Sequence, residues 1–167
     1  LRHAKSSWDD PELADIDRPL AGRGRRDAEA IATYLRDQEI VPALILCSPA
    51  RRARQTLKPL KQRLTGSRIV IEDALYAASA DRLLRMVREI EDEVPSALLI
   101  AHEPGIRQLA LLLAPKGAGK ALARVQEKFP TGAVAALAIS SGNWASLAPG
   151  DAELRWFVRP KELRDGG

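Results

Sequence analysis

The two histidines of this chain are the residues best suited to chemistry. His3 lies in the opening stretch 1–5, and His102 lies in the run 101–105, which reads Ala-His-Glu-Pro-Gly. Each histidine follows an apolar or strand-like segment and precedes polar sequence. In an open α/β sheet this is where a strand presents its last side chain to a ligand. The neutral form of histidine is available at pH 7, so each could be a nucleophile, an acid or base, or a metal ligand.

The neighbouring arginines decide among these chemistries. Arg2 precedes His3, and the run 48–56 contains Arg51, Arg52 and Arg54. A guanidinium group repels a metal cation but binds a phosphoryl group through a planar fork of donors. Two histidines with converging arginines therefore favour phosphoryl transfer through a phosphohistidine, with transition-state charge stabilised by the guanidinium groups. We expect no metal and no cofactor.

These motifs resemble those of the histidine phosphatase (phosphoglycerate mutase-like) superfamily. Arg2-His3-Ala4 is similar to its RHG/RHA signature, and residues 5–8 resemble its small SixA-type phosphohistidine phosphatase branch. The resemblance spans residue 2 to about residue 140 and implies a three-layer α/β/α sandwich with a mainly parallel central sheet. The other matching segments follow in the order of that branch: Arg18-Pro19-Leu20, Gly24, residues 48–56 and residues 102–105.

The resemblance also implies a role for each site residue. His3 is the nucleophile, and its second ring nitrogen must donate to a backbone carbonyl or similar acceptor. Arg2, Arg52 and His102 are expected to bind the phosphoryl oxygens, with Arg18 as an additional phosphate ligand. The family pattern selects Arg52 as the pocket arginine, whereas helical spacing alone leaves Arg51 open.

One departure from the family bears on the substrate. Larger members carry a glutamate that protonates an alkoxide leaving group, and no carboxylate falls at the comparable place in residues 72–78. Asp17, Glu103 or water could serve instead. The nitrogen leaving group of phosphohistidine needs less assistance than an alkoxide, so this departure favours a phosphoramidate over a sugar phosphate ester.

Chain length favours the same substrate class, because larger members use insertions to enclose small substrates. We expect the substrate to be phosphohistidine on a phosphotransfer protein. The alternative within the superfamily is a small-molecule phosphomonoesterase.

Residues 4–20 are rich in Asp, Ser and Pro and have no helical or strand period, which predicts a long loop. Loops of this length inside compact domains are often functional. Two interpretations of its acids remain open: a solvated loop that also caps the next helix, or one acid that neighbours the arginines or supplies a proton. The four acids are Asp9, Asp10, Asp15 and Asp17.

Strands and helices are predicted to alternate, which indicates a mainly parallel, three-layer fold. The helices are expected over residues 24–38, from Pro49 to about 64, over 80–93 and over 106–113. The strands are expected over residues 43–47, 68–72, 97–101, 133–139 and around 154–158. We expect a loop at 115–119 and a loose tail over 159–167.

The composition fits a single domain over residues 1–167, with the first strand truncated at the N-terminus. The net charge of +4 mildly favours an anionic partner. No apolar run approaches the roughly 20 residues of a membrane span, so no membrane partner is expected. One cysteine excludes an internal disulfide, which fits a cytoplasmic protein. Cys47 also lacks the arginine six positions later that a cysteine phosphatase needs, because residue 53 is Ala.

The competing class is a basic nucleic-acid or phosphate-binding module without catalysis. No aromatic residue is interleaved with the arginines for base stacking, so nucleic acid is not the expected partner. The arginines of such a patch would be Arg23, Arg25, Arg26, Arg51, Arg52 and Arg54.

Overall fold

A parallel sheet of three short strands forms the centre of the fold. The computed structural model describes residues 1–116, 119–140 and 142–164. Strands β1 (Leu44–Cys47), β2 (Arg68–Ile71) and β3 (Ala97–Ile100) are parallel in the order β2-β1-β3. All four residues of β1 are buried, which is why its sequence is apolar without alternation. Strands β4 (Val134–Ile139) and β5 (Ala152–Val158) form an antiparallel pair.

The first residues of the chain connect these two groups of strands. On one side the amino group of Leu1 donates to the Leu99 carbonyl, and the His3 amide donates to Ala101. On the other side the Arg2 amide donates to Ala133. Residues 1–3 therefore lie between β3 and the start of β4, which brings His3 to the edge where β3 ends.

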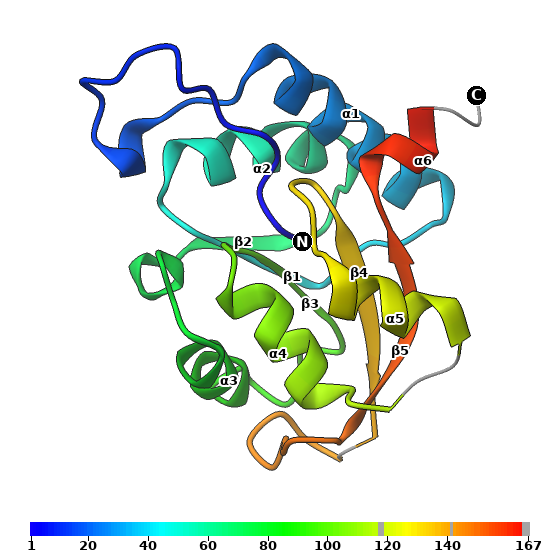
Figure 1. The fold of residues 1–167 in the computed structure, drawn as a ribbon. Coiled ribbons are helices and arrows are strands. Elements are labelled where there is room, and N and C mark those ends of the chain that lie inside the picture. Colours follow the sequence, from blue (N-terminus) through cyan, green and yellow to red (C-terminus); the bar gives the residue numbers. More distant parts are fainter. Residues whose placement is uncertain (117–118, 141, 165–167) are drawn as a thin grey trace.

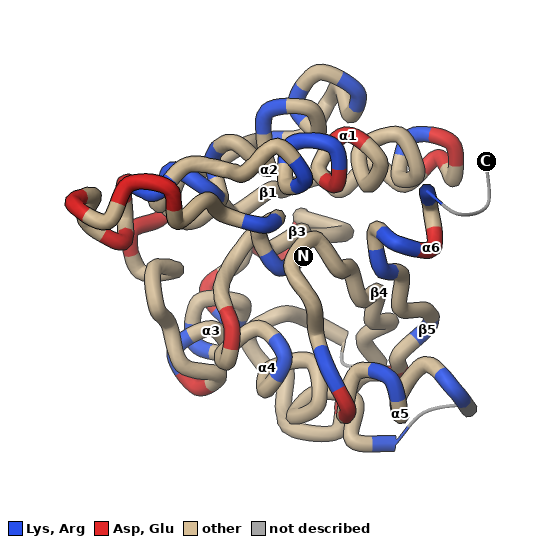
Figure 2. Tube along the Cα trace, turned by 45° about the horizontal axis from the view of Figure 1, so that its top comes forward, with Lys and Arg blue, Asp and Glu red and all other residues tan. Residues whose placement is uncertain are grey.

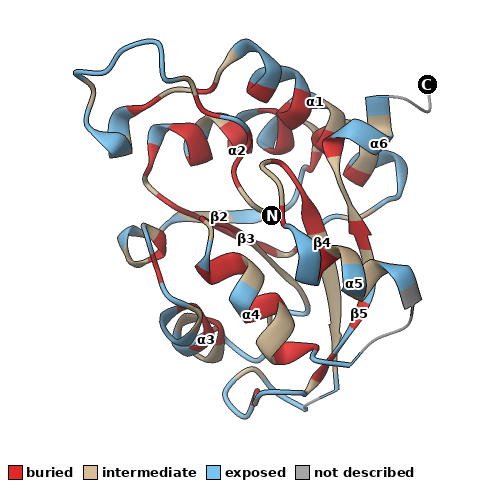
Figure 3. Ribbon diagram, in the orientation of Figure 1, coloured by how far each residue is buried: buried red, intermediate tan, exposed pale blue. Residues whose placement is uncertain are grey.

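Helices cover both faces of the sheet (Figure 1). One face carries α1 (Gly22–Asp37), α2 (Arg51–Arg63) and α6 (Pro160–Arg164), and the other carries α3 (Ala80–Arg88), α4 (Gly105–Leu113) and α5 (Gly119–Glu127). Buried residues line the sides of the helices that face the strands (Figure 3). The predicted three-layer α/β/α sandwich with a mainly parallel sheet is thereby confirmed. None of the helices in the described part of the chain is long and apolar enough to cross a membrane.

Three local predictions were wrong. Helix α5 was not predicted, because its apolar positions Ala121, Leu122 and Val125 make only one turn of pattern after a glycine-rich stretch. Helix α3 ends at Arg88 rather than at residue 93, where acids at 91–93 would be unfavourable at a helix C-terminus. The expected loose tail forms α6 over residues 160–164, with Pro160 buried and Arg164 paired to the buried Asp27 of α1. Residues 165–167 of the predicted tail lie outside the described residues.

Gly24 on α1 is required by the close approach of the chain that follows His3. A Cβ atom at this position would lie 2.1 Å from the Lys5 carbonyl oxygen, which is backbone and cannot move aside cheaply. We expect Gly24→Ala to lower the free energy of unfolding by at least about 2 kcal/mol, as overpacking does. Gly22→Ala is the matched control, because its nearest atoms are ends of flexible arginines at 3.8 Å or more.

This control should change stability by no more than about 1 kcal/mol and in the stabilising direction, since alanine favours the helix. Urea unfolding midpoints of the two variants measure the difference. Equal midpoints would show that the contact between α1 and Lys5 does not constrain the chain after His3.

Candidate active site

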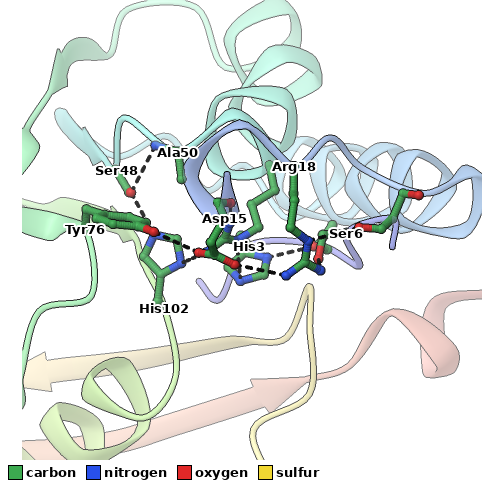
Figure 4. Close-up of polar contacts among 11 residues, drawn as sticks. His3, Ser6, Asp15, Arg18, Ser48, Ala50, Tyr76 and His102 are labelled. Carbon is green, nitrogen blue, oxygen red and sulfur yellow. Dashed lines mark hydrogen bonds and ion pairs between the residues drawn. The ribbon is translucent and has the colours of Figure 1, made fainter. Parts of the chain in front are cut away.

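The structure brings the two histidines together at the carboxyl end of the sheet. His3 follows the segment that lies beside β3, and His102 follows β3 itself by two residues. Their ring centroids are 5.0 Å apart and both side chains are buried. Figure 4 shows the rings side by side, with Arg18 and Asp15 approaching from the loop. The predicted meeting of the two imidazoles at one site is confirmed.

His3 is held in the tautomer that a nucleophile requires. Its Nδ1 lies 2.8 Å from the carbonyl oxygen of Ala4, which can only accept, so Nδ1 carries the proton and donates. Its Nε2 accepts from Nε of Arg52 at 3.3 Å, so this nitrogen is unprotonated and its lone pair points toward Arg52. Thr56 on α2 fixes the neighbouring backbone, because its Oγ1 accepts from the Ala4 amide at 3.0 Å.

Arg52 connects the two rings from the first turn of α2. Its Nη2 donates to Nδ1 of His102 at 3.3 Å and to Oδ2 of Asp15 at 2.8 Å. The guanidinium is buried, whereas the side chains of Arg51 and Arg54 are exposed. The structure therefore places Arg52, and not Arg51, against the histidines, as the family pattern predicted.

His102 is held between Arg52 and the uncharged side chains of Ser48 and Tyr76. Because Nδ1 accepts from Arg52, Nε2 bears the proton and donates to Oγ of Ser48 at 2.7 Å. Ser48 directly follows β1, and its Oγ also accepts from the Ala50 amide. The ring of Tyr76 meets that of His102 edge-on, with centroids 5.5 Å apart.

Arg18 approaches the histidines from the predicted loop, in which residues Asp15–Asp17 form the short helix η1. Its Nη1 donates to Oδ1 of Asp15 at 2.9 Å, and its Nη2 donates to Oγ of Ser6 at 2.9 Å. The guanidinium stacks on the indole of Trp8, 3.1 Å from the ring centroid, while 71% of Trp8 is exposed. Arg18 makes no hydrogen bond with either histidine among the described residues, so it joins the site through Asp15.

Arg2 is the least directly connected of the predicted residues. Its Nη1 donates to the carbonyl of Phe129 at 2.7 Å, and its Nε is buried without a partner within the described ranges. Its positive charge nevertheless adds to burial and to the charge of Arg52 in lowering the pKa values of His3 and His102.

Burial makes both imidazoles weak bases. It lowers the pKa of His3 to about 3 and the pKa of His102 to about 4, and the nearby charge of Arg52 acts in the same direction. Burial raises the pKa of Asp15, but hydrogen bonds from Tyr76 and Arg52 outweigh this and hold its pKa below the usual range. At pH 7 the site therefore holds two neutral imidazoles and an ionised carboxylate.

These pKa values predict an acid-sensitive fold. An unfolded chain protonates histidine near pH 6.5, whereas folded His3 stays neutral down to about pH 3. Below pH 6.5 the unfolded state binds protons that the folded state does not, so the free energy of unfolding falls as pH falls. Between pH 7.5 and pH 5 His3 alone should account for about 2 kcal/mol of this loss.

Urea unfolding of the wild type and of His3→Gln at both pH values isolates that contribution. The wild type should lose about 2 kcal/mol more than the variant between pH 7.5 and pH 5. Equal losses would mean that folded His3 accepts a proton as readily as an exposed histidine does.

Sequence reasoning missed the roles of three residues that contact the predicted ones. Asp15 was among the four loop acids, and the interpretation in which one acid neighbours the arginines is confirmed for it. Tyr76, whose hydroxyl donates to Asp15 at 2.8 Å, lies within residues 72–78, where the family pattern predicts only a carboxylate. Ser48 directly follows a predicted strand, which was the available signal. Within residues 72–78, the Glu72 side chain accepts from the amide of Ala74 and caps the short helix η2 (Asp73–Leu75).

Two other features do not take part in the site. Cys47 is fully buried, and burial raises its pKa to about 12, so its thiol is inert. A cavity of about 590 Å³ opens between β3 and β4, but it is lined mostly by apolar side chains and by neither histidine. This cavity is therefore separate from the two histidines, which lie at the carboxyl end of β3.

Comparisons with known proteins agree with this geometry. The sequence model of the histidine phosphatase superfamily (branch 1) matches residues 1–77. The chain is 39% identical over 165 residues to an uncharacterised protein of Mycobacterium tuberculosis, Rv1276c, covering 96% of this chain and 100% of that protein.

Solved structures named SixA have the same fold. A structure described as the putative phosphohistidine phosphatase SixA from Agrobacterium tumefaciens superposes with a TM-score of 0.79 and 31% identity, covering 96% of this chain and 95% of that one. The protein histidine phosphatase SixA complexed with tungstate gives a TM-score of 0.77 and 25% identity, covering 98% of this chain and 96% of that one. This chain belongs to the histidine phosphatase superfamily.

Proposed function

We propose that this protein is a metal-independent phosphatase that acts through a phosphohistidine formed on His3. The observation that carries the proposal is the fixed tautomer of His3, whose Nδ1 donates to Ala4 and whose Nε2 lone pair faces Arg52. A nucleophile in this position needs no base to deprotonate it, because burial already keeps the imidazole neutral.

In the proposed reaction Nε2 of His3 attacks phosphorus in line with the leaving group. Arg52 then exchanges its bonds to the protein for bonds to the phosphoryl oxygens, with Arg2 and Arg18 adding positive charge around them. A phosphoryl anion would also raise the pKa of His102, so that its Nδ1 takes a proton and donates to an oxygen. Water then attacks the phosphohistidine and releases phosphate.

We propose phosphohistidine on a phosphotransfer protein as the substrate. On the loop side of the site Asp15 and Trp8 are exposed, which suits a substrate side chain carried by another protein. The SixA relatives support this substrate class by their names, and the tungstate bound to one of them is an oxyanion of phosphate-like shape. The argument from a missing acid no longer separates the substrates, because Asp15 supplies a carboxylate from another segment.

Turnover of four substrates in EDTA tests both parts of the proposal. The panel is a phosphohistidine protein, a phosphoserine peptide, p-nitrophenyl phosphate and 3-phosphoglycerate. We expect hydrolysis of p-nitrophenyl phosphate without added metal, and kcat/KM for the phosphohistidine protein at least about tenfold above that for the other three. If kcat/KM for 3-phosphoglycerate equalled that for the phosphohistidine protein, the preference for phosphohistidine would be wrong. The protein would then be a small-molecule phosphomonoesterase. A lack of turnover in EDTA that metal restores would refute metal independence.

The competing hypothesis, a nucleic-acid-binding module without catalysis, predicts no turnover of any of these substrates. Figure 2 shows Lys and Arg spread over helices on both faces of the sheet and interspersed with acids. Two members of the postulated patch are engaged with protein, since Arg52 is buried and Arg25 donates to the Leu20 carbonyl. Salt-dependent nucleic-acid binding without any phosphatase activity would favour that module instead.

A further inference from the structure

Asp15 is the carboxylate of the histidine pocket. Its Oδ2 accepts from Nη2 of Arg52 and from the Tyr76 hydroxyl, both at 2.8 Å, and its Oδ1 accepts from Nη1 of Arg18 at 2.9 Å. The Asp15 backbone carbonyl accepts from Nη1 of Arg52 as well. Figure 4 shows the carboxylate between Tyr76 and Arg18, beside the rings of His3 and His102.

The donors that hold Asp15 are the ones an entering phosphoryl group needs. A phosphoryl group that binds Nη2 of Arg52 must displace Oδ2 of Asp15 or share that donor with it. The carboxylate then loses guanidinium bonds and gains an anion as neighbour, and both changes favour its protonated form. Its side chain is half exposed, so it has room to turn toward the leaving atom.

We propose that Asp15 protonates the leaving group in the first step and accepts a proton from water in the second. The inference rests on the proposed phosphoryl transfer through His3 and identifies the acid and base of that reaction. The acid and base then come from η1, and not from residues 72–78, where the superfamily pattern leads one to expect a glutamate.

The two steps balance. In the first, Nε2 of His3 bonds to phosphorus, the bond from phosphorus to the leaving atom breaks, and that atom takes its electron pair and the proton of Asp15. In the second, a water oxygen bonds to phosphorus and its proton passes to the Asp15 carboxylate. The bond to Nε2 breaks with its electron pair returning to His3. Phosphate departs, which leaves Asp15 protonated. Asp15 ionises when Arg52 binds its carboxylate again.

The other candidate acids are less well placed. Asp17 is exposed, and in the described part of the chain its side chain makes no hydrogen bond or ion pair with His3, His102 or Arg52. Burial raises the pKa of Glu103, which suits an acid, but its carboxylate is paired with Arg107 of α4 at 3.0 Å. Glu103 makes no hydrogen bond to His3, His102 or Arg52 among the described residues. Of these three acids, all within the described part of the chain, Asp15 is the one that bonds to Arg52, and Arg52 touches both imidazoles.

Asp15→Asn and a series of aryl phosphates test the proposal. The asparagine keeps the size of the side chain but cannot deliver the proton. We expect kcat/KM of the variant to stay within about threefold of wild type for 2,4-dinitrophenyl phosphate, whose leaving group needs no acid. For phenyl phosphate, a poor leaving group, we expect a loss of about 100-fold. Asp17→Asn is the matched control on the same turn and should follow the wild type across the series.

Inhibition by inorganic phosphate reports on the pocket itself. In Asp15→Asn the inhibition constant should be unchanged or lower, because the variant no longer competes for Arg52 with a negative charge. A uniform loss for all aryl phosphates together with weaker phosphate inhibition would overturn the proposal and leave Asp15 as a support for Arg52. A leaving-group-dependent loss in Glu103→Gln instead would assign the acid to Glu103. If His3→Gln retained full activity in the same assays, the failure would lie in the proposed function and not in the choice of acid.

Discussion

Replacing His3 with glutamine should lower kcat/KM for p-nitrophenyl phosphate by about 100,000-fold, which is the scale observed when an enzyme loses its nucleophile. Glutamine is close in size and can accept from Arg52, so the loss reports on the missing imidazole rather than on an empty space. His102→Gln is expected to cost only about 100- to 1,000-fold, because His102 is proposed to bind phosphoryl oxygens without forming a covalent bond. The two variants therefore separate the roles of two neighbouring rings.

Rapid quenching of the reaction with a substrate labelled in its phosphoryl group shows directly which histidine is the nucleophile. Quenched in base, the wild type should retain label on the protein, since phosphohistidine survives alkali, whereas His3→Gln should retain none. His102→Gln should still be labelled, although more slowly. Label that persists in His3→Gln and disappears in His102→Gln would reverse the assignment of the two rings.

The parts of the fold that sequence predicted are those with a clear apolar pattern. β1 is buried on both faces and so reads as an uninterrupted apolar run, and α1 shows a repeated apolar stripe. Helices α5 and α6 are short, with a single turn of apolar positions, and neither carries enough periodicity to be distinguished from a loop. Their stability comes from tertiary packing, which a local pattern does not contain.

The sequence predicts the positions of those site residues that directly follow a strand. His3 and His102 each follow a strand-like segment, so the parallel sheet alone brings them to one edge. The position of Asp15 depends instead on how residues 4–20 fold back. That path is set by the Ser6–Leu20 bridge, the hydrogen bond from the Ser7 amide to Pro19, and the contact of Lys5 with Gly24. No spacing rule selects Asp15 from Asp17, because an irregular loop has no period.

Arg52→Lys should lower kcat/KM by about 1,000-fold although it keeps the positive charge. Arg52 donates from Nε to Nε2 of His3 and from Nη2 to both Nδ1 of His102 and Oδ2 of Asp15, and these two nitrogen atoms lie in one rigid plane. A lysine has one nitrogen on a flexible stem and cannot reproduce this fork. We expect Arg52→Ala to be no more than about tenfold worse than Arg52→Lys, since geometry rather than charge alone stabilises the transferring group.

Arg54→Lys is the matched control, because Arg54 lies two residues further along α2 and is exposed. Its kcat/KM should stay within about twofold of wild type, and so should inhibition by phosphate. In Arg52→Lys, inhibition by phosphate should weaken together with kcat/KM, because the same nitrogens bind the ground-state anion and the transition state. If Arg52→Lys retained most of the activity, a point charge near the rings would be sufficient. The contacts of Arg52 would then serve to hold Asp15 and the histidines in place before substrate arrives.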